Sequence, residues 1–72
     1  MFDFDVRMLS GEPFTLEGLK REFSRNDEQA RRIELRLRQF QREGLIEFKR
    51  QGLRITWTAT VAGKSKLEEK SG

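Results

Sequence analysis

The segment that most restricts the fold is Asn26 to Gly44, because its sequence describes one helix together with both of its ends. Asn26 is a favoured N-cap residue, and Gln29 three positions later resembles a capping box. Gly44 is the residue type that most often ends a helix in a left-handed conformation. The apolar residues between these ends share one narrow arc of the helix: Ala30, Ile33, Leu37 and Phe40. The sequence therefore predicts an amphipathic helix over residues 27–43 with one buried stripe.

The residues that follow Gly44 predict a β-hairpin over residues 46–57. The runs EFKR and LRITWTATV have strand character, and Gln51-Gly52 between them suits a tight two-residue turn. This turn pairs Arg50 with Leu53, Phe48 with Ile55, and Ile46 with Trp57. The last two pairs place four large apolar side chains on one face of the hairpin. We expect that face to pack against the core.

A second, shorter helix is predicted ahead of the long one. Thr15 is a fair N-cap, and Leu16, Leu19 and Phe23 then form one apolar face. The opening residues 2–9 fit two patterns, because their apolar side chains alternate as in a strand and also share one helical face. At the other end, the polar residues 62–72 predict a disordered tail behind a domain that spans residues 1–61.

Composition excludes several classes of protein. The chain has 72 residues and contains neither cysteine nor histidine. A chain of this length forms one domain, with a core near the lower limit for independent stability. Without these residues it lacks disulfides, thiolate metal ligands and the commonest general base at neutral pH, so we expect no enzyme, no metal and no cofactor. No apolar run approaches the roughly 20 residues of a membrane helix, and no signal peptide is evident, so we expect a cytoplasmic protein without a membrane partner.

The arginines are concentrated in one part of the chain. Eight of the ten lie between Arg25 and Arg54, whereas three of the five lysines lie in the tail. A planar guanidinium suits bidentate contact with phosphates and base edges. An ordinary solvated surface is the alternative, since three helix arginines follow an acidic residue at the i, i+4 spacing of surface ion pairs: Asp27–Arg31, Glu28–Arg32 and Glu34–Arg38. Both interpretations remain open at this point.

The order of these elements resembles the winged helix-turn-helix family. The resemblance covers residues 14–57, FTLEGLKREFSRNDEQARRIELRLRQFQREGLIEFKRQGLRITW, and its best local cue is LRQFQREGLI, where a helix ends in glycine and two aliphatic residues begin a strand. It implies an α+β fold in which two or three helices are followed by a β-hairpin wing. Because a first helix normally precedes this unit in the family, the resemblance favours a short helix over residues 3–9.

The resemblance also implies a function. In winged-helix DNA-binding domains the second helix of the turn lies in the major groove, and the wing contacts phosphates or the minor groove. The implied partner is double-stranded DNA, bound by a homodimer or beside a protein partner, in a transcriptional or mobile-element regulator. Carried over to this chain, the contacts are Arg25 in the turn, Gln29, Arg31, Arg32, Arg36 and Gln39 on the helix, and Lys49, Arg50, Gln51 and Arg54 on the wing.

The helix also contains features that disagree with DNA binding. Asp27 and Glu28 stabilise the positive end of the helix dipole, yet they would sit where a recognition helix meets phosphates. Leu35 lies in the middle of the polar face and suits either a thymine methyl group or a protein surface. The alternative function is therefore a winged-helix module that binds another protein and not DNA.

Overall fold

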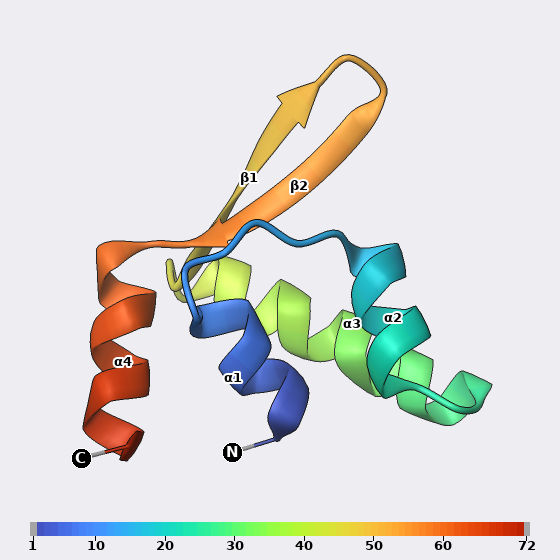
Figure 1. Cartoon of the computed structure of the whole chain (residues 1–72), viewed down its shortest axis with the longest axis horizontal. Coiled ribbons are helices and arrows are strands. Elements are labelled where there is room, and N and C mark those ends of the chain that lie inside the picture. Colours follow the sequence, from blue (N-terminus) through green and yellow to red (C-terminus); the bar gives the residue numbers. More distant parts are fainter. Residues whose placement is uncertain (1, 72) are drawn as a thin grey trace.

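The computed structural model describes residues 2–71, with side chains described up to residue 69. The elements follow the order α1 (Asp3–Leu9), α2 (Leu16–Phe23), α3 (Asp27–Arg42), β1 (Ile46–Gln51), β2 (Arg54–Ala59) and α4 (Val61–Ser71). The four helices form a body from which the antiparallel β1–β2 hairpin projects (Figure 1). The predicted α+β class, with helices followed by a hairpin, is confirmed at this level.

The opening segment is a helix, as the resemblance favoured, but the helical face of Phe2, Val6 and Leu9 is not the buried one, since Phe2 and Val6 are 48% and 42% exposed. Phe4, Met8 and Leu9 of α1 are buried together, which a strand could not achieve because its successive side chains point to opposite faces. The Asp5 carboxylate accepts a hydrogen bond from the backbone N–H of Phe2 at 3.2 Å. This carboxylate therefore closes the N-terminal end of α1 from inside the core.

Local side-chain bonds define the starts of α2 and α3. Thr15 Oγ1 accepts from the N–H of Gly18 at 3.0 Å, and Asn26 Oδ1 accepts from the N–H of Gln29 at 2.9 Å. Both predicted N-caps are confirmed. The reciprocal bond of the predicted capping box is displaced by one residue, because Gln29 Oε1 accepts from the N–H of Arg25 at 2.7 Å and not from that of Asn26.

The end of α3 is also confirmed. Gly44 has a φ of 76°, and the N–H of Leu45 donates to the carbonyl of Phe40 at 2.9 Å. The N–H of Gly44 donates to the carbonyl of Gln41 at 3.2 Å. Together these two bonds form a Schellman motif, which satisfies two of the last carbonyls and turns the chain into β1.

The predicted turn begins one residue too early, so each predicted cross-strand partner is wrong by two residues. The turn residues are Gly52 and Leu53, and the pairs are Gln51 with Arg54, Arg50 with Ile55, Lys49 with Thr56, Phe48 with Trp57, Glu47 with Thr58, and Ile46 with Ala59. Gly52 has a φ of 62° and Leu53 does not have a positive φ. That combination is typical of a type II′ turn, which needs glycine at its first central position. The predicted faces of the hairpin are nevertheless correct. A shift of two residues leaves each side chain on the same face, because side chains in a strand alternate with a period of two.

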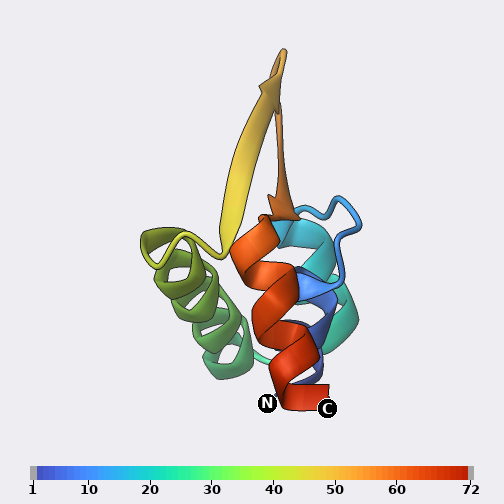
Figure 2. The same cartoon turned by 90° about the vertical axis from the view of Figure 1, so that its left-hand side faces the viewer.

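The apolar face of the hairpin is buried only at its base. Ile46 and Ala59 lie in the interior, whereas Phe48 and Ile55 are 55% and 41% exposed and Leu53 is fully exposed. The prediction that Phe48 and Ile55 pack on the core is therefore wrong. The reason is spatial, because the distal half of the hairpin extends beyond the helices (Figure 2), and an open hollow lies between Ile55 and the start of α2.

One residue outside the hairpin pairs with the base of β2 as a third strand would. Phe14, between α1 and α2, forms an antiparallel bridge with Trp57 through two backbone hydrogen bonds of 2.9 and 2.8 Å. Their rings stack with centroids 6.3 Å apart. Below them, the core joins α1, α2, α3 and the start of β1, with these buried residues: Phe4, Met8, Leu9, Phe14, Leu19, Ile33, Leu37, Phe40, Leu45 and Ile46.

The structure has a helix, α4, where the sequence predicted a disordered tail. Thr60 fixes its start: its Oγ1 accepts from the N–H of Gly63 at 3.2 Å and donates to the carbonyl of Gly44 at 2.6 Å. Gly63 allows close backbone contact, since a Cβ there would lie 2.1 Å from the carbonyl oxygen of Leu45. Leu67 packs against the core. These contacts are non-local, so the polar composition of the segment did not reveal them.

Candidate nucleic-acid interface

The residues on the polar side of α3 divide into two groups, and the first faces α1. Arg36 forms a two-pronged ion pair with Asp5, with Nη2 2.8 Å from Oδ2 and Nε 3.1 Å from Oδ1. Asp5 is completely buried, whereas the Arg36 side chain is 31% exposed. Together with the N–H of Phe2, the guanidinium gives this buried carboxylate three donors. A paired geometry of this kind is among the strongest polar contacts in proteins.

Further contacts hold this side of α3 in place. The Arg36 guanidinium lies 4.8 Å from the centre of the Phe40 ring and donates to Gln39 Oε1 at 3.2 Å. The Arg32 guanidinium lies 5.7 Å from the ring centre of Phe2. We call Arg32, Arg36 and Gln39 the α1 flank. Arg36 within it is occupied by the fold itself, so a free contact with DNA, as the resemblance implied, does not fit its position.

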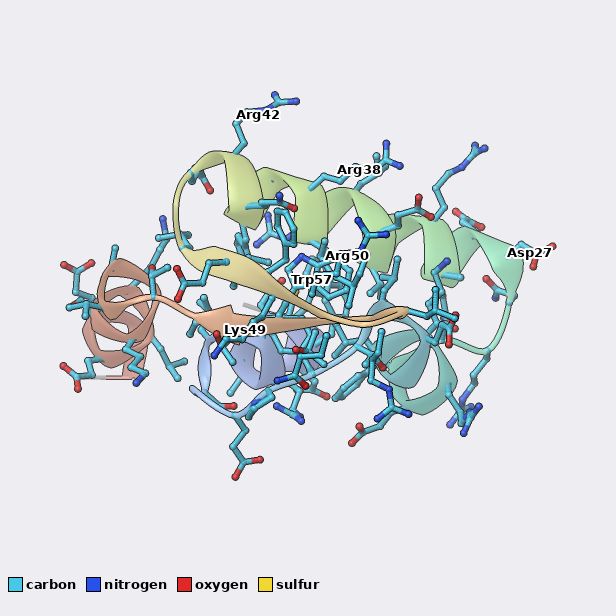
Figure 3. The ribbon with its side chains drawn as sticks, turned by 90° about the horizontal axis from the view of Figure 1, so that it is seen from above. Asp27, Arg38, Arg42, Lys49, Arg50 and Trp57 are labelled. Atoms are coloured by element: carbon cyan, nitrogen blue, oxygen red, sulfur yellow. The ribbon has the colours of Figure 1, made fainter. Side chains whose placement is uncertain are left out.

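The second group lies opposite the core. Arg31, Leu35, Arg38 and Arg42 follow one another on this side of α3, and we call them the outer face. Figure 3 shows Arg38 and Arg42 extending away from the rest of the molecule. Arg38 is paired with Glu34 at 3.1 Å but stays 69% exposed. Arg31 and Arg42 are exposed and have no acidic partner among the described side chains.

The hairpin cations lie on both of its faces. The register places Arg50 on the face of Phe48 and Trp57, and places Lys49, Gln51 and Arg54 on the opposite face. In Figure 3, Arg50 is directed to the same side of the hairpin as Arg38 and Arg42, and Lys49 to the other side. All four polar residues of the distal hairpin are exposed. The helix and the hairpin therefore share a cationic side that includes Arg50 and excludes Lys49.

Charge is distributed unevenly along α3. Of the three predicted i, i+4 ion pairs, the described residues form only Glu34–Arg38, while Glu34 also lies 3.5 Å from Lys20 of α2. Asp27 and Glu28 remain exposed at the N-terminal end, and Figure 3 shows Asp27 at the opposite end of the helix from Arg42. The first turn of α3 is therefore acidic, whereas Arg38 and Arg42 lie towards the hairpin base, where Glu43 is also exposed.

The two predicted contact residues near the turn between α2 and α3 differ in whether their side chains are already hydrogen-bonded. The side chain of Gln29 is engaged with the backbone of Arg25, as described above, whereas the side chain of Arg25 is exposed. Gln29 therefore has a structural role at the start of α3. Arg25 keeps a free guanidinium beside the acidic end of the helix.

Arg38 and Arg42 were absent from the predicted contact set, although their spacing could have revealed them. They lie seven and eleven residues after Arg31, which puts all three on one helical face opposite the apolar arc. Arg36, by contrast, could not have been recognised as a structural residue, because Asp5 is 31 residues away in the sequence.

Within residues 2–71, no group of carboxylates has the arrangement of a metal site, and no helix has the length and apolar character needed to cross a membrane. Comparison with protein families, with curated proteins and with solved structures finds no match for this chain.

Proposed function

We propose that this protein is a winged helix-turn-helix domain that binds duplex DNA and acts as a transcriptional or mobile-element regulator. In this proposal the outer face of α3 enters the major groove, and the β1–β2 hairpin is the wing. Arg31, Arg38 and Arg42 take the place of Arg36 as the helix contacts. The observation that carries the proposal is the exposed arginine side of α3, continued by Arg50 on the hairpin.

The order of elements supports the family assignment. Three helices precede the hairpin, and Phe14, between the first two, pairs with β2. This pairing ties the segment between α1 and α2 to the hairpin base, so the hairpin keeps a defined position beside α3. A wing needs such a position, because its contacts and those of the helix must reach one duplex together.

The dimensions and charges of α3 also support the proposal. An α-helix together with its side chains is about 10–12 Å across, which matches a major groove about 12 Å wide. The acidic residues Asp27 and Glu28 lie at the end remote from the hairpin base, which separates them from Arg38, Arg42 and Arg50, whereas Arg31 lies one helical turn from Asp27. Leu35, exposed between the outer arginines, suits contact with a thymine methyl group.

A protein-binding role is the second candidate, and a specific observation favours it. Phe48, Leu53 and Ile55 expose apolar surface on the distal hairpin, where Leu53 and Ile55 line an open hollow beside α2. Exposed apolar clusters of this kind often mark surfaces that contact other proteins. In this alternative the arginines would serve as a solvated rim around an apolar contact.

A titration with a labelled random duplex separates the two candidates. DNA binding predicts clear association at about 50 mM salt that falls steeply towards about 200 mM, because cations on the protein displace counterions from phosphates. Fluorescence anisotropy measures both the affinity and its dependence on salt. No association at the lower salt concentration would reject DNA binding and leave the protein-binding candidate.

A pair of double variants tests the position of the interface. Arg31→Ala with Arg42→Ala is expected to lower the magnitude of the log–log salt slope by roughly 2, since each lost phosphate contact changes it by about 0.9. Lys64→Ala with Lys66→Ala removes the same charge from α4, which packs against α1 and β2, and is expected to leave the slope nearly unchanged. Equal slopes for the two double variants would reject the outer face as the contact surface.

A further inference from the structure

The tip of the hairpin carries an apolar side chain in a position that the fold does not use. Leu53 is the second residue of the tight turn and is fully exposed. Turns of this length are usually built from glycine, asparagine or aspartate, which suit both the backbone and the solvent. Gly52 alone satisfies the backbone requirement here, with its φ of 62°. Leu53 therefore has no conformational or packing role within the chain.

The neighbours of Leu53 along the hairpin are cationic, although Glu17 of α2 lines the same open hollow as Leu53 and Arg54. Arg50 lies on one face of the hairpin, and Lys49 and Arg54 lie on the other, within four residues of the tip. No acidic residue occurs between positions 48 and 67. A groove of duplex DNA has phosphates along both of its walls, so cations on both faces of a narrow ribbon suit that partner.

We propose that the hairpin tip enters a DNA groove and that Leu53 inserts between two base pairs, which bends the duplex. This inference rests on the proposed DNA binding and extends it to a deformation of the DNA. Apolar wedges that enter the minor groove partly unstack a base step and kink the duplex by about 20–90°. Arg50 and Arg54, on opposite faces of the ribbon, would hold the phosphates on either side of the wedge.

The length of the hairpin suits this contact. The six residues of β1 at about 3.3 Å each extend roughly 20 Å. On one side of a duplex, the distance from a major groove to the next minor groove is about half a helical turn, or roughly 17 Å. With α3 in the major groove, the tip can therefore reach the neighbouring minor groove. Figure 2 shows that the hairpin extends well beyond the helices, so the body of the protein does not obstruct the tip.

The same observations give a preference among sequences. Pyrimidine–purine steps such as TA are the most easily unstacked, and A·T pairs lack the amino group that obstructs the minor groove at guanine. Binding is therefore expected to be tighter for a duplex with a central TA step than for a G·C duplex of the same length. This preference would arise without a hydrogen bond from Leu53 to any base.

The experiment measures DNA bending and affinity together. A 30-base-pair duplex with a central TA step carries a donor and an acceptor dye at its two ends, and energy transfer is recorded during titration with wild-type protein and with Leu53→Ala. Val61→Ala is the matched control, because it shortens an exposed aliphatic side chain at the start of α4 and leaves both the tip and α3 intact. Leu53 and Val61 are both exposed, so both variants are expected to keep the wild-type melting temperature.

The expected result is increased energy transfer with wild-type protein and with Val61→Ala, and loss of that increase with Leu53→Ala, which still binds. Binding of wild-type protein without bending, or equal bending by Leu53→Ala, would overturn the wedge and leave the proposed DNA binding intact. No binding by wild-type protein at low salt would overturn both. A dimer in sedimentation velocity that Leu53→Ala converts to monomer would overturn the wedge as well, because Leu53 would then contact a second copy of the chain.

Discussion

The α1 flank and the outer face of α3 contain the same residue type on one helix, yet their arginines have different surroundings. Arg36 of the α1 flank contacts a buried carboxylate, an aromatic ring and a glutamine amide. Arg42 of the outer face has no acidic partner among the described side chains and extends into solvent. The difference shows that the helix surface is not one cationic front. The role of each arginine on α3 depends on which part of the protein, or solvent, lies next to it.

The physical basis of this difference is burial of Asp5. A carboxylate removed from water must regain its lost hydration through donors and an opposite charge. The N–H of Phe2 and two nitrogens of Arg36 supply them. No comparable demand exists at Arg31 or Arg42, so those guanidinium groups remain available to an external anion.

The largest expected effect comes from breaking the buried ion pair. Arg36→Ala is expected to lower the free energy of unfolding by about 3 kcal/mol, because it leaves Asp5 buried without its charge partner. Urea denaturation followed by circular dichroism measures the change. Arg42→Ala is the control, and a surface substitution of this kind changes stability by less than about 0.5 kcal/mol.

A double-variant cycle sharpens the same prediction. Asp5→Ala combined with Arg36→Ala is expected to cost less than the sum of the two single variants, since neither charge is then left alone. Additive losses would show that the two side chains do not interact. Equal stability of Arg36→Ala and Arg42→Ala would remove the distinction between the two sides of α3.

An intermediate effect is expected for Arg36→Lys. The ammonium group keeps the positive charge but cannot make two parallel bonds to Asp5, and it lacks the planar guanidinium that lies 4.8 Å from the centre of the Phe40 ring. We expect a loss of about 1–2 kcal/mol, between the effect of alanine and no effect, since a typical intramolecular hydrogen bond contributes about 1 kcal/mol. A loss as large as that of Arg36→Ala would mean that geometry, and not charge, accounts for the stability.

The smallest effect is expected at Glu34, which lies between α2 and the outer face. Glu34→Gln removes the charge that pairs with Lys20 and Arg38, and both pairs are partly exposed to solvent. Such pairs contribute about 0–1 kcal/mol, and we expect the loss to disappear at about 1 M salt. Thermal denaturation at two salt concentrations measures it. A loss that persists at high salt would indicate a packing role for this side chain.

The same variant also probes the proposed interface. Without its partner Glu34, Arg38 gains freedom and the outer face gains net positive charge. We therefore expect Glu34→Gln to bind the random duplex more tightly than wild-type protein at low salt. Weaker binding would mean that Glu34 positions Arg38 for its contact.

Several elements could be predicted because their signals are local. The N-caps at Thr15 and Asn26, the apolar arc of α3 and the end at Gly44 all depend on residues within one or two helical turns. The faces of the hairpin strands were correct for the same reason, since alternation survives a shift of two residues. The register itself was not predictable from the position of Gly52 alone, because the glycine could be the first or the second turn residue.

Other features depended on contacts between distant segments. Segment 61–71 is polar and weakly amphipathic, and it becomes α4 because Thr60, Gly63 and Leu67 meet residues that lie far away in the sequence. The exposure of Phe48 and Ile55 likewise depends on how far the hairpin extends past the helices. No pattern within the hairpin carries that information.

The sequence by itself determined where the helices of the central unit begin and end, which stripe of α3 is apolar and which residues share a face of the hairpin. These properties follow from backbone hydrogen bonds and side-chain periodicity over a few residues. Only the tertiary structure decided which arginines are free, because Asp5 reaches Arg36 across 31 positions of the chain. Whether an arginine pairs within the protein or stays free to bind an external anion depends on its burial and on the charged groups around it. Folding brings those groups together from distant parts of the chain.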